Sequence, residues 1–231
     1  MNLGTVSALA CRIAPWLPPV PIDRVRATAG TGLPGDVNAD ARSPRHVLLA
    51  SAAVYEELSL PPQSLRENLL VDFDTSQLAS GTVLQVGGQV LLRLMFQCEA
   101  CGRLDIHQPG LSRKIGARRG MLARVITGGA IHPGDQVRDL GRLLPAWSDD
   151  WRDRLAQVLD AVPADAVIEY KHLARLAGVQ SSYCRAFPRV IASLGARYAG
   201  KAVASTSATA HPRWEGEGLF DHLPLTATVL V

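Results

Sequence analysis

The residues with the clearest chemical potential are two cysteines spaced as Cys-x-x-Cys, Cys98 and Cys101. They follow an apolar run at residues 94–96 and precede Gly102, so the sequence predicts a strand that ends in two thiols. A thiolate is both a nucleophile and a metal ligand. A Cys-x-x-Cys pair is typical of a redox pair, half of a zinc site, or a nucleophile with a resolving partner. We therefore predict that this strand end is the reactive site.

The role of Cys98 has several interpretations. Zinc would require two further ligands, and His107 is near in the sequence, but the chain has no second Cys-x-x-Cys. If Cys101 carries a persulfide, Cys98 would displace the sulfur and leave a disulfide. Alternatively, Cys98 points inward along its strand and packs as a small apolar residue. Cys11 lies in an apolar run and is predicted to be in the core, and Cys184 is isolated.

Basic residues are predicted to surround this thiol. Arg103 is two residues from Cys101, and nearby positive charge favours a thiolate. A barrel would bring further basic side chains to the same rim, namely Arg66, Lys114, Arg118 and Arg119. Such arginines can bind a phosphate through two hydrogen bonds, and the carboxamide of Asn68 is predicted to orient a cofactor or substrate. The alternative is an ordinary solvated basic face.

The elements that must position these residues are mostly strands. Residues 82–86 and 89–96 read as a hairpin joined by Gly87 and Gly88. Further strands are predicted near the N-terminus and at residues 47–49, 66–71, 121–126 and 130–137, with a helix at 51–60 capped by Ser51 and a short basic helix at 112–119. Many short strands between glycine-rich turns predict a barrel or a sandwich. The glycine-rich segment 30–45 is expected to be a connecting loop, or one that brings N–H groups to an anion.

Beyond residue 145 the pattern becomes helical. A helix is predicted at 151–161 with Ser148 or Asp149 as its N-cap, an extended piece at 167–170, a helix at 171–177 closed by Gly178, and a third helix from about Ser182. This order indicates a small helix-turn-helix unit. The predicted fold is α+β, with domains at residues 1–145 and 146–231.

Composition and charge restrict the class of protein. The 231 residues are 47% hydrophobic and 19% charged, and four cysteines do not make a disulfide scaffold. The net charge of +3 does not by itself indicate a polyanion partner. The N-terminus lacks the pattern of a signal peptide, and no run of 18 apolar residues occurs. We expect a cytoplasmic protein without a membrane partner.

A series of motifs across residues 25–140 resembles MOSC domains, which are named after the C-terminus of molybdenum cofactor sulfurase. The motifs, in the order that the family shows, are Gly32-Leu33-Pro34-Gly35-Asp36, Arg45-His46-Val47-Leu48-Leu49, Arg66-Glu67-Asn68-Leu69, Gly81, Cys101-Gly102-Arg103-Leu104, Arg119-Gly120 and Gly134-Asp135. The resemblance implies a β-barrel-like fold, a reactive cysteine, and a role in sulfur transfer or in holding the molybdenum cofactor. The family cysteine precedes a leucine by three residues, which selects Cys101 over Cys98 as persulfide carrier or molybdenum ligand.

The second part resembles the winged-helix DNA-binding domain of alkylguanine-DNA alkyltransferases and alkyltransferase-like proteins. The similarity lies in residues 166–174, Gly178, and Cys184-Arg185-Ala186. It implies that Tyr170 helps to turn a nucleotide and that Arg185 fills the gap left in the duplex. The family's Pro-Cys-His-Arg acceptor motif is missing from residues 200–207, so alkyl transfer is not expected. Pro188 is expected to kink the would-be recognition helix.

Two functions from different classes follow. The first is a sulfur carrier or molybdenum-cofactor-binding barrel that uses Cys101, with a cysteine desulfurase or a molybdoenzyme as partner; some family members are thought to reduce N-hydroxylated bases. The second is a non-enzymatic module that binds DNA or modified nucleobases through Tyr170 and Arg185.

Overall fold

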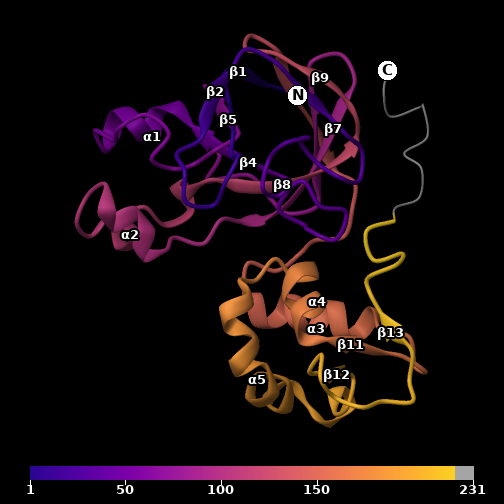
Figure 1. The fold of residues 1–231 in the computed structure, drawn as a ribbon. Coiled ribbons are helices and arrows are strands. Elements are labelled where there is room, and N and C mark those ends of the chain that lie inside the picture. Colours follow the sequence, from indigo (N-terminus) through magenta and orange to yellow (C-terminus); the bar gives the residue numbers. More distant parts are fainter. Residues whose placement is uncertain (222–231) are drawn as a thin grey trace. The chain divides into compact units, whose positions relative to one another are not determined.

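The computed structural model describes residues 1–221, and the chain forms two compact units (Figure 1). The first unit is Met1–Ala41 with Arg45–Ala146. The second is Arg42–Pro44 with the chain from Trp147 onward. The main division therefore falls between Ala146 and Trp147, whereas the sequence pattern places it near residue 145.

The core of the first unit is a closed β-barrel. Seven of its strands form the barrel: β1 (Asn2–Cys11), β4 (Val47–Ser51), β5 (Leu69–Val71), β6 (Thr82–Val86), β7 (Val90–Gln97), β8 (Met121–Thr127) and β10 (Gln136–Arg142). They follow one another in the order β10-β6-β7-β8-β4-β5-β1, and pairing of β1 with β10 closes the ring. At the edges β2 (Val20–Ile22) extends β1, and β3 (Val25–Ala27) pairs with β9 (Gly129–Ile131). The barrel predicted from the glycine-punctuated strands is confirmed.

Alternating side chains of these strands fill the barrel. The buried cluster inside it includes Leu49, Leu92, Leu94 and Val125, each of which is 0% exposed. Successive side chains of a strand point to opposite faces, so a residue at every second position enters this core. The apolar runs of the predicted hairpin thereby become the inner wall of the barrel.

The first strand differs from its prediction. The sequence indicates one short strand before the prolines, but β1 has ten residues and pairs with β10, β5 and β2. Its register shifts between Asn2 and Gly4 and again between Val6 and Ala8. Each shift reverses the side-chain alternation. The alternating pattern that reveals a strand in the sequence is therefore interrupted twice.

The segment before β5 also differs. Residues 66–71 were expected to be a strand with polar first residues, but Arg66 has a φ of 56° and the strand begins at Leu69. A left-handed backbone cannot continue a β-ladder. Arg66 therefore belongs to the preceding loop.

Short helices cover one side of the barrel. They are α1 (Ala52–Glu57), the 3₁₀ turn η1 (Gly102–Ile106), α2 (Leu111–Lys114) and the 3₁₀ turn η2 (Gly116–Arg119). Figure 1 shows α1 and α2 side by side on that flank. A second apolar cluster, which includes Leu65, Leu104 and Leu111, joins them. Ser51 occupies the N-cap position of α1 as predicted, but its side chain makes no capping hydrogen bond.

The second unit combines three helices with a small sheet. Its elements are α3 (Trp151–Ala161), β11 (Val167–Glu169), α4 (Tyr170–Leu176), η3 (Ser181–Ala186), α5 (Phe187–Leu194), η4 (Ala196–Tyr198), β12 (Ala202–Val203) and β13 (Arg213–Trp214). Both β12 and β13 pair with β11 in parallel. The predicted helices are confirmed, while these parallel pairings do not establish a winged helix.

Two local predictions in this unit are corrected. The N-cap of α3 is Asp150, whose carboxylate accepts from the backbone N–H of Arg152, rather than Ser148 or Asp149. Pro188 lies in the first turn of α5 and begins that helix instead of kinking it. Proline is tolerated there because the first helical N–H groups have no partner within the helix. None of the helices in residues 1–221 combines the length and apolar character of a membrane-spanning segment.

Candidate functional site

The two predicted cysteines lie in contrasting environments where the chain leaves β7. Cys98 is 5% exposed, its backbone N–H donates to the carbonyl oxygen of Gly120 at 2.8 Å, and Nη2 of Arg45 lies 3.7 Å from its Sγ. Cys101 is exposed and stands at the N-cap position of η1. Both are free thiols. Cys101 can meet an external molecule, whereas the burial of Cys98 agrees with its packing inward.

The turn from η2 into β8 sets the position of Arg119. Gly120 has a φ of +113°, and a Cβ there would lie 2.3 Å from the carbonyl oxygen of Leu49 in β4. Only glycine allows this close approach at this backbone conformation. The end of η2 is consequently held against the strand ends that carry Cys98 and Leu49.

Four arginines from separate parts of the chain gather near this end: Arg12, Arg66, Arg103 and Arg119. Burial lowers the pKa of Arg66, and the positive charges of Arg103, Arg12 and Arg119 lower it further. We call these four residues the arginine cluster. Two predicted cofactor-binding residues, Arg103 and Arg119, therefore lie near enough to a third, Arg66, to affect its charge, as does Arg12, which was not predicted from the sequence.

Within the arginine cluster, Arg119 is the residue whose buried side-chain nitrogens lack hydrogen-bond partners among residues 1–221. It is 7% exposed, and its Nε and Nη1 find no hydrogen-bond partner among residues 1–221. A buried polar group without a partner carries a desolvation cost, and for a charged group that cost is larger. Guanidinium nitrogens left open in this way are suited to receive an anion.

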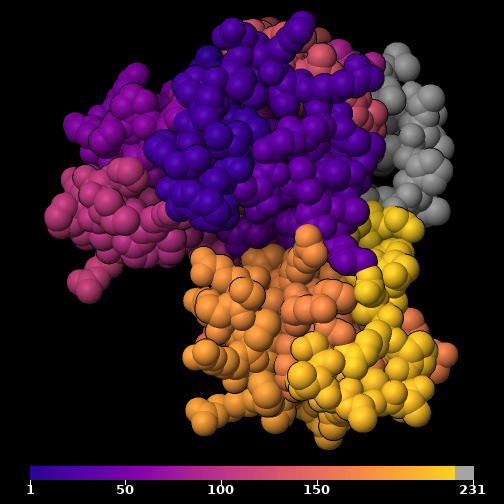
Figure 2. Space-filling model, viewed as in Figure 1, coloured from indigo at the N-terminus to yellow at the C-terminus, as the bar shows by residue number. Residues whose placement is uncertain are grey.

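The proline-rich loop after β1 engages two other members of the cluster. Arg66 donates through Nη1 to the carbonyl oxygen of Leu17 at 2.6 Å and through Nη2 to that of Ala14 at 3.4 Å. Arg103 donates through Nη1 to the carbonyl oxygen of Pro15 at 2.8 Å. Figure 2 shows the indigo N-terminal segment against the magenta segment around residue 100. The loop thus holds both side chains in place while using only part of their donors.

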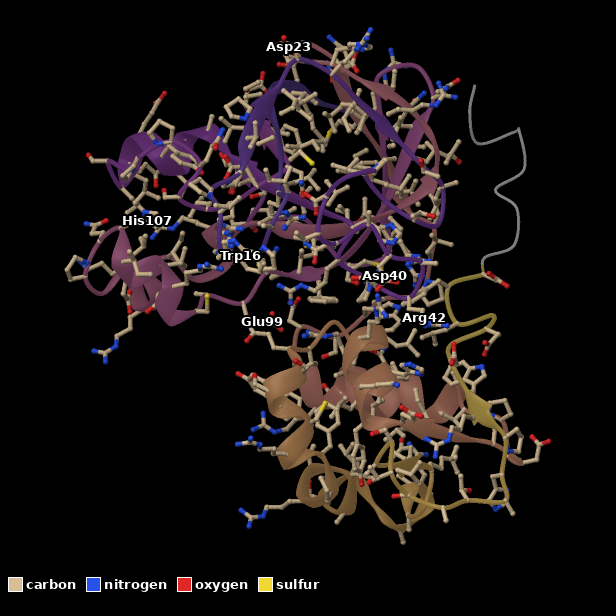
Figure 3. All side chains as sticks on the ribbon, in the orientation of Figure 1. Trp16, Asp23, Asp40, Arg42, Glu99 and His107 are labelled. Atoms are coloured by element: carbon tan, nitrogen blue, oxygen red, sulfur yellow. The ribbon has the colours of Figure 1, made fainter. Side chains whose placement is uncertain are left out.

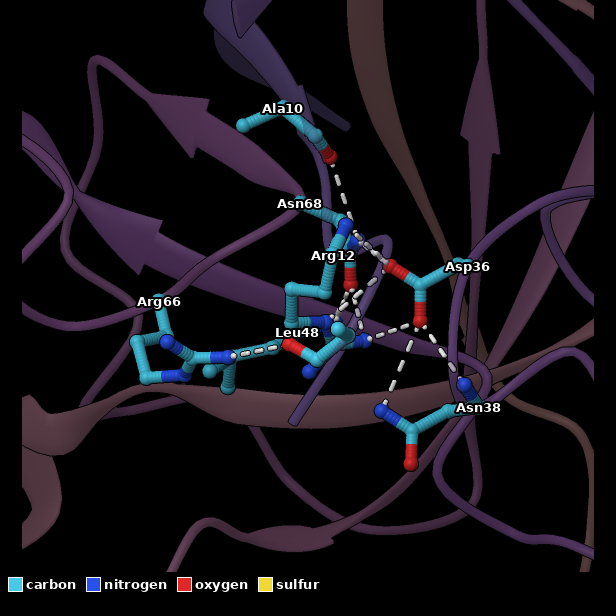
Figure 4. Close-up of polar contacts among 8 residues, drawn as sticks. Ala10, Arg12, Asp36, Asn38, Leu48, Arg66 and Asn68 are labelled. Atoms are coloured by element: carbon cyan, nitrogen blue, oxygen red, sulfur yellow. Dashed lines mark hydrogen bonds and ion pairs between the residues drawn. The ribbon is translucent and has the colours of Figure 1, made fainter. Parts of the chain in front are cut away.

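Arg12 belongs to a buried network with Asp36 and Asn68 (Figure 4). Nε and Nη2 of Arg12 reach the two carboxylate oxygens of Asp36 at 3.1 and 3.0 Å, and Nη2 also donates to Oδ1 of Asn68 at 2.6 Å. Burial alone would raise the pKa of Asp36, but the Arg12 charge and hydrogen bonds from Arg12 and Asn38 outweigh it and lower that pKa. This is a closed, charge-paired structural network.

Asn68 does not have the freedom that its predicted role requires. Its Nδ2 donates to the carbonyl oxygen of Ala10 and to Asp36, and its Oδ1 accepts from Arg12 and from the backbone N–H of Leu48. An amide offers two donors and two acceptor lone pairs. All are used inside the protein, so Asn68 braces the barrel instead of orienting a ligand.

Two of the predicted basic residues lie apart from this arrangement. Arg118 donates to Glu57 at 3.1 Å and to the carbonyl oxygen of Lys114 at 2.9 Å. Lys114 is exposed at the end of α2. Residues of a 3₁₀ turn point in directions about 120° apart, so the neighbours Arg118 and Arg119 face different surroundings. Arg118 belongs to the outer surface.

The zinc interpretation gains no support from the geometry. In Figure 3 His107 lies beside α2, away from Glu99, the residue next to Cys98. Across residues 1–221 no group of three or more His, Cys, Asp or Glu side chains is placed to hold a metal ion. Cys98 and His107 therefore do not form part of a zinc site there.

His46, which belongs to the motif at residues 45–49, is fully buried. Its Nδ1 accepts from the backbone N–H of Val125 at 3.2 Å, which is consistent with the neutral tautomer that carries the proton on Nε2. That Nε2 lies 3.0 Å from both the carbonyl oxygen of Asp40 and Nη1 of Arg124. Burial and the nearby charge of Arg124 lower its pKa to about 4. The imidazole of His46 is therefore neutral near pH 7 and connects the start of β4 to β8.

In the second unit, the two residues predicted to contact nucleic acid lie in different environments. The ring of Tyr170 meets that of Phe187 edge-on at 6.1 Å, and its carbonyl oxygen accepts from the Cys184 thiol at 3.4 Å. Arg185 is exposed on η3. Tyr170 is engaged in packing, whereas Arg185 remains accessible.

Comparison with known proteins supports the resemblance for the first unit. Residues 42–138 match the family model described as MOSC domain. The YuaD protein from Bacillus subtilis is similar in structure, with 18% identity, 59% of this chain and 94% of that chain covered, and a TM-score of 0.52. A structure described as a hypothetical protein has 18% identity, 84% and 90% coverage, and a TM-score of 0.51. YiiM from Escherichia coli gives 18% identity, 84% and 94% coverage, and a TM-score of 0.49.

None of the curated proteins compared with the chain matches it. No finding supports an alkyltransferase-like domain, so the resemblance suggested by residues 166–186 stays a prediction. The first two structural neighbours share the fold of this chain, and the family match covers the segment that carries Cys98, Cys101, Arg66, Arg103 and Arg119. The match to the MOSC domain model is confined to residues 42–138, less than half of the chain, and it supports for that segment the resemblance seen in the sequence.

Proposed function

We propose that the first unit holds a molybdenum cofactor of the molybdopterin type, with Cys101 as the protein ligand to the metal and the arginine cluster as the anchor for the cofactor's phosphate. The observation that carries the proposal is that Nε and Nη1 of the buried Arg119 have no hydrogen-bond partner among residues 1–221, although the carboxyl of Glu67 is near enough for their charges to interact. Burying a cation without a partner is costly unless an anion completes the site.

The residues present fit such a group. Phosphate oxygens match the fork of guanidinium donors, so Nε and Nη1 of Arg119 can bind one phosphate through two hydrogen bonds. Cys101 supplies an exposed sulfur, and Arg103 stands two residues further on in η1. A metal that arrives within an organic cofactor needs few ligands from the protein, which agrees with a single accessible cysteine.

The protein's own groups would bind and position. Arg119 and Arg66 would hold the phosphate, the proline-rich loop would keep Arg66 and Arg103 oriented, and Cys101 would fix the metal end. The cofactor, when bound, would supply redox chemistry, and the family resemblance points to N-hydroxylated bases as substrates. Buried Cys98 takes no part as a ligand in this proposal.

Metal and pterin content test the proposal directly. Full-length protein from cells that make the cofactor should contain molybdenum and a fluorescent oxidised pterin in similar molar amounts. Cys101→Ser and Arg119→Met should each lose about tenfold or more of both, equivalent to about 1.4 kcal/mol of binding. Arg118→Met removes the neighbouring charge that faces Glu57 and should retain both. Unaltered metal content in Cys101→Ser would refute the assignment of the ligand.

A second candidate is sulfur transfer through the same thiol. The exposed position of Cys101 allows a desulfurase to reach it, while Cys98 precedes it by three residues. Incubation with a cysteine desulfurase and cysteine should then add one sulfur atom to Cys101, seen by intact-mass analysis and absent in Cys101→Ser. Protein that gains sulfur but contains no molybdenum would favour the carrier over the cofactor-binding function.

Nucleic-acid binding by the second unit is a third candidate, favoured by one surface. Tyr183, 45% exposed, and the exposed Arg185 and Arg189 lie together on η3 and the first turn of α5. Aromatic and basic side chains in proximity can stack on bases and contact phosphates. A salt-dependent shift of labelled single-stranded DNA, lost in Arg185→Ala and kept in Arg138→Ala on β10, would support it. Equal binding by both variants would exclude this surface.

A further inference from the structure

The loop between α1 and β5 has an unusual backbone. Ser59, Gln63 and Arg66 have φ values of 50°, 60° and 56°, and in residues 1–221 no other non-glycine residue has a positive φ. Such conformations are disfavoured and persist only where the surroundings impose them. Strain of this kind gathers at binding sites more often than elsewhere, so the cavity beside this loop is of interest.

A cavity of about 400 Å³ lies between this loop and the barrel wall. Ala8, Leu9 and Leu70 of β1 and β5 form one side, and Leu60 and Pro62 of the loop form another. Pockets that bind small molecules usually have volumes of roughly 300–1,000 Å³ and mostly apolar walls with a few polar groups. The volume and lining suit a molecule of one or two rings.

The acidic group in this cavity is Glu67. Glu67 is 4% exposed, and among the described residues the one side chain that donates to its carboxyl is Tyr55, whose hydroxyl reaches Oε2 at 2.6 Å; the backbone N–H of Glu67 donates as well. Burial raises the pKa of Glu67 despite the nearby charges of Arg119 and Arg12. A buried carboxyl with one side-chain donor has capacity for another.

Two other polar residues of the cavity, Asn68 and Tyr55, have little hydrogen-bonding capacity left for a ligand. Asn68 also lines it, but its amide is fully used by Ala10, Asp36, Arg12 and Leu48. The Tyr55 hydroxyl both donates to Glu67 and accepts from the backbone N–H of Leu65 at 3.1 Å. Gln63 also lines the cavity but is only partly buried, so Glu67 is the buried group to which a ligand would bind.

We propose that this cavity is a second ligand site, which takes a small, largely apolar, neutral molecule that donates an N–H or O–H hydrogen bond to Glu67. The apolar walls exclude a strongly hydrated molecule. An anion would meet the carboxyl, and a cation would lie near Arg12 and Arg119, so a neutral donor fits best. The site does not depend on the cofactor proposal, because its lining residues do not include Cys101 or a member of the arginine cluster.

Ligand-observed NMR on the full-length protein tests the site, with benzamide as the probe. Benzamide carries an apolar ring and a neutral N–H donor. It should bind the wild type, benzoate should not bind, and toluene should bind more weakly than benzamide. Glu67→Gln should weaken benzamide binding by about tenfold, because hydrogen bonds to an acidic group are stronger than those to an amide.

Ala8→Phe provides a second variant with little risk to folding, because Ala8 is exposed on β1 and lines the cavity. The added ring should abolish benzamide binding. Ser7→Phe adds the same bulk to the neighbouring exposed position outside the lining and should leave binding intact. Absence of benzamide binding to the wild type, or equal binding by Ala8→Phe, would overturn the site. Equal binding of benzamide by Glu67→Gln would overturn the role of Glu67. Molybdenum content reports separately on the cofactor proposal.

Discussion

Arg12 and Arg119 are buried to the same extent, each 7% exposed, yet they have opposite environments. Arg12 is paired with a carboxylate and an amide, and the network around it is closed. Arg119 leaves two guanidinium nitrogens open within the described residues. A buried charge with a complete set of partners stabilises a fold, whereas one that lacks partners indicates that a ligand supplies them. The hydrogen bonds of the two arginines therefore distinguish them where burial alone does not, and this difference is why we propose a ligand for Arg119 and not for Arg12.

The strongest test of this contrast is Arg12→Met. The substitution leaves the Asp36 carboxylate buried without its counter-charge, and removal of one partner of a buried ion pair costs about 3–5 kcal/mol. The free energy of unfolding, measured by urea denaturation, should fall by that amount. The double variant Arg12→Met/Asp36→Leu should recover part of it, because no unpaired charge remains. A loss below about 1 kcal/mol would mean that the network is not closed as described.

His46 sharpens the comparison because it is a neutral group in a closed network. Its pKa is about 4 in the folded protein and about 6.5 when unfolded, so its neutral form contributes stability that is complete above pH 6.5 and is lost as the pH falls toward 4. The difference corresponds to about 3 kcal/mol. Denaturation midpoints at several pH values should show this decline in the wild type and a shallower one in His46→Gln. Parallel declines in both proteins would contradict the assignment.

Arg154 extends the comparison to the second unit, where backbone carbonyl oxygens accept hydrogen bonds from a buried arginine. It is 0% exposed and donates to the carbonyl oxygens of Ser148, Asp149 and Ala177 at 3.0, 2.9 and 2.8 Å. Arg154→Met would leave acceptors unpaired and should cost about 2 kcal/mol in the free energy of unfolding. Arg152→Met, on the exposed face of α3, serves as the matched control and should change it by less than about 0.5 kcal/mol. If the two variants lowered the free energy of unfolding equally, the carbonyl contacts of Arg154 would not stabilise the fold.

Arg119→Met should have a much smaller effect on stability than Arg12→Met. Removing this charge relieves its desolvation cost but also removes its attraction to the nearby Glu67, so the free energy of unfolding of the cofactor-free protein should stay within about 1 kcal/mol of the wild type. A decrease above about 2 kcal/mol would place Arg119 with Arg12 among the structural arginines. The same variant is expected to lose bound molybdenum, which would distinguish Arg119 from the structural Arg12.

The fold was predictable where the local pattern is strong. Alternating and continuous apolar runs bounded by glycines indicated β4, β6, β7 and β8, and the helical spacing of Leu155, Val158 and Leu159 indicated α3. The strand β1 was underestimated because two register shifts break its alternation. The short parallel strands β12 and β13 have two residues each and carry no pattern at all.

The candidate site was predictable in composition but not in arrangement. Proximity to Cys101 pointed to Arg103, and the motif series pointed to Arg66 and Arg119. Arg12 was missed because it is 24 residues from Asp36, although a lone arginine at the end of an apolar run is a detectable signal. The sequence cannot show that Arg118 faces outward and its neighbour inward, because that depends on a 3₁₀ turn packed against Gly120.

The closure of the barrel by β1 and β10 has a consequence for biosynthesis. Asn2 pairs with Arg138, so β1 is synthesised more than a hundred residues before its partner β10 exists. Contacts between residues so distant in sequence slow folding and expose unpaired strand edges during translation. The nascent chain is therefore exposed to aggregation before β10 emerges, which is the stage at which chaperones can protect it.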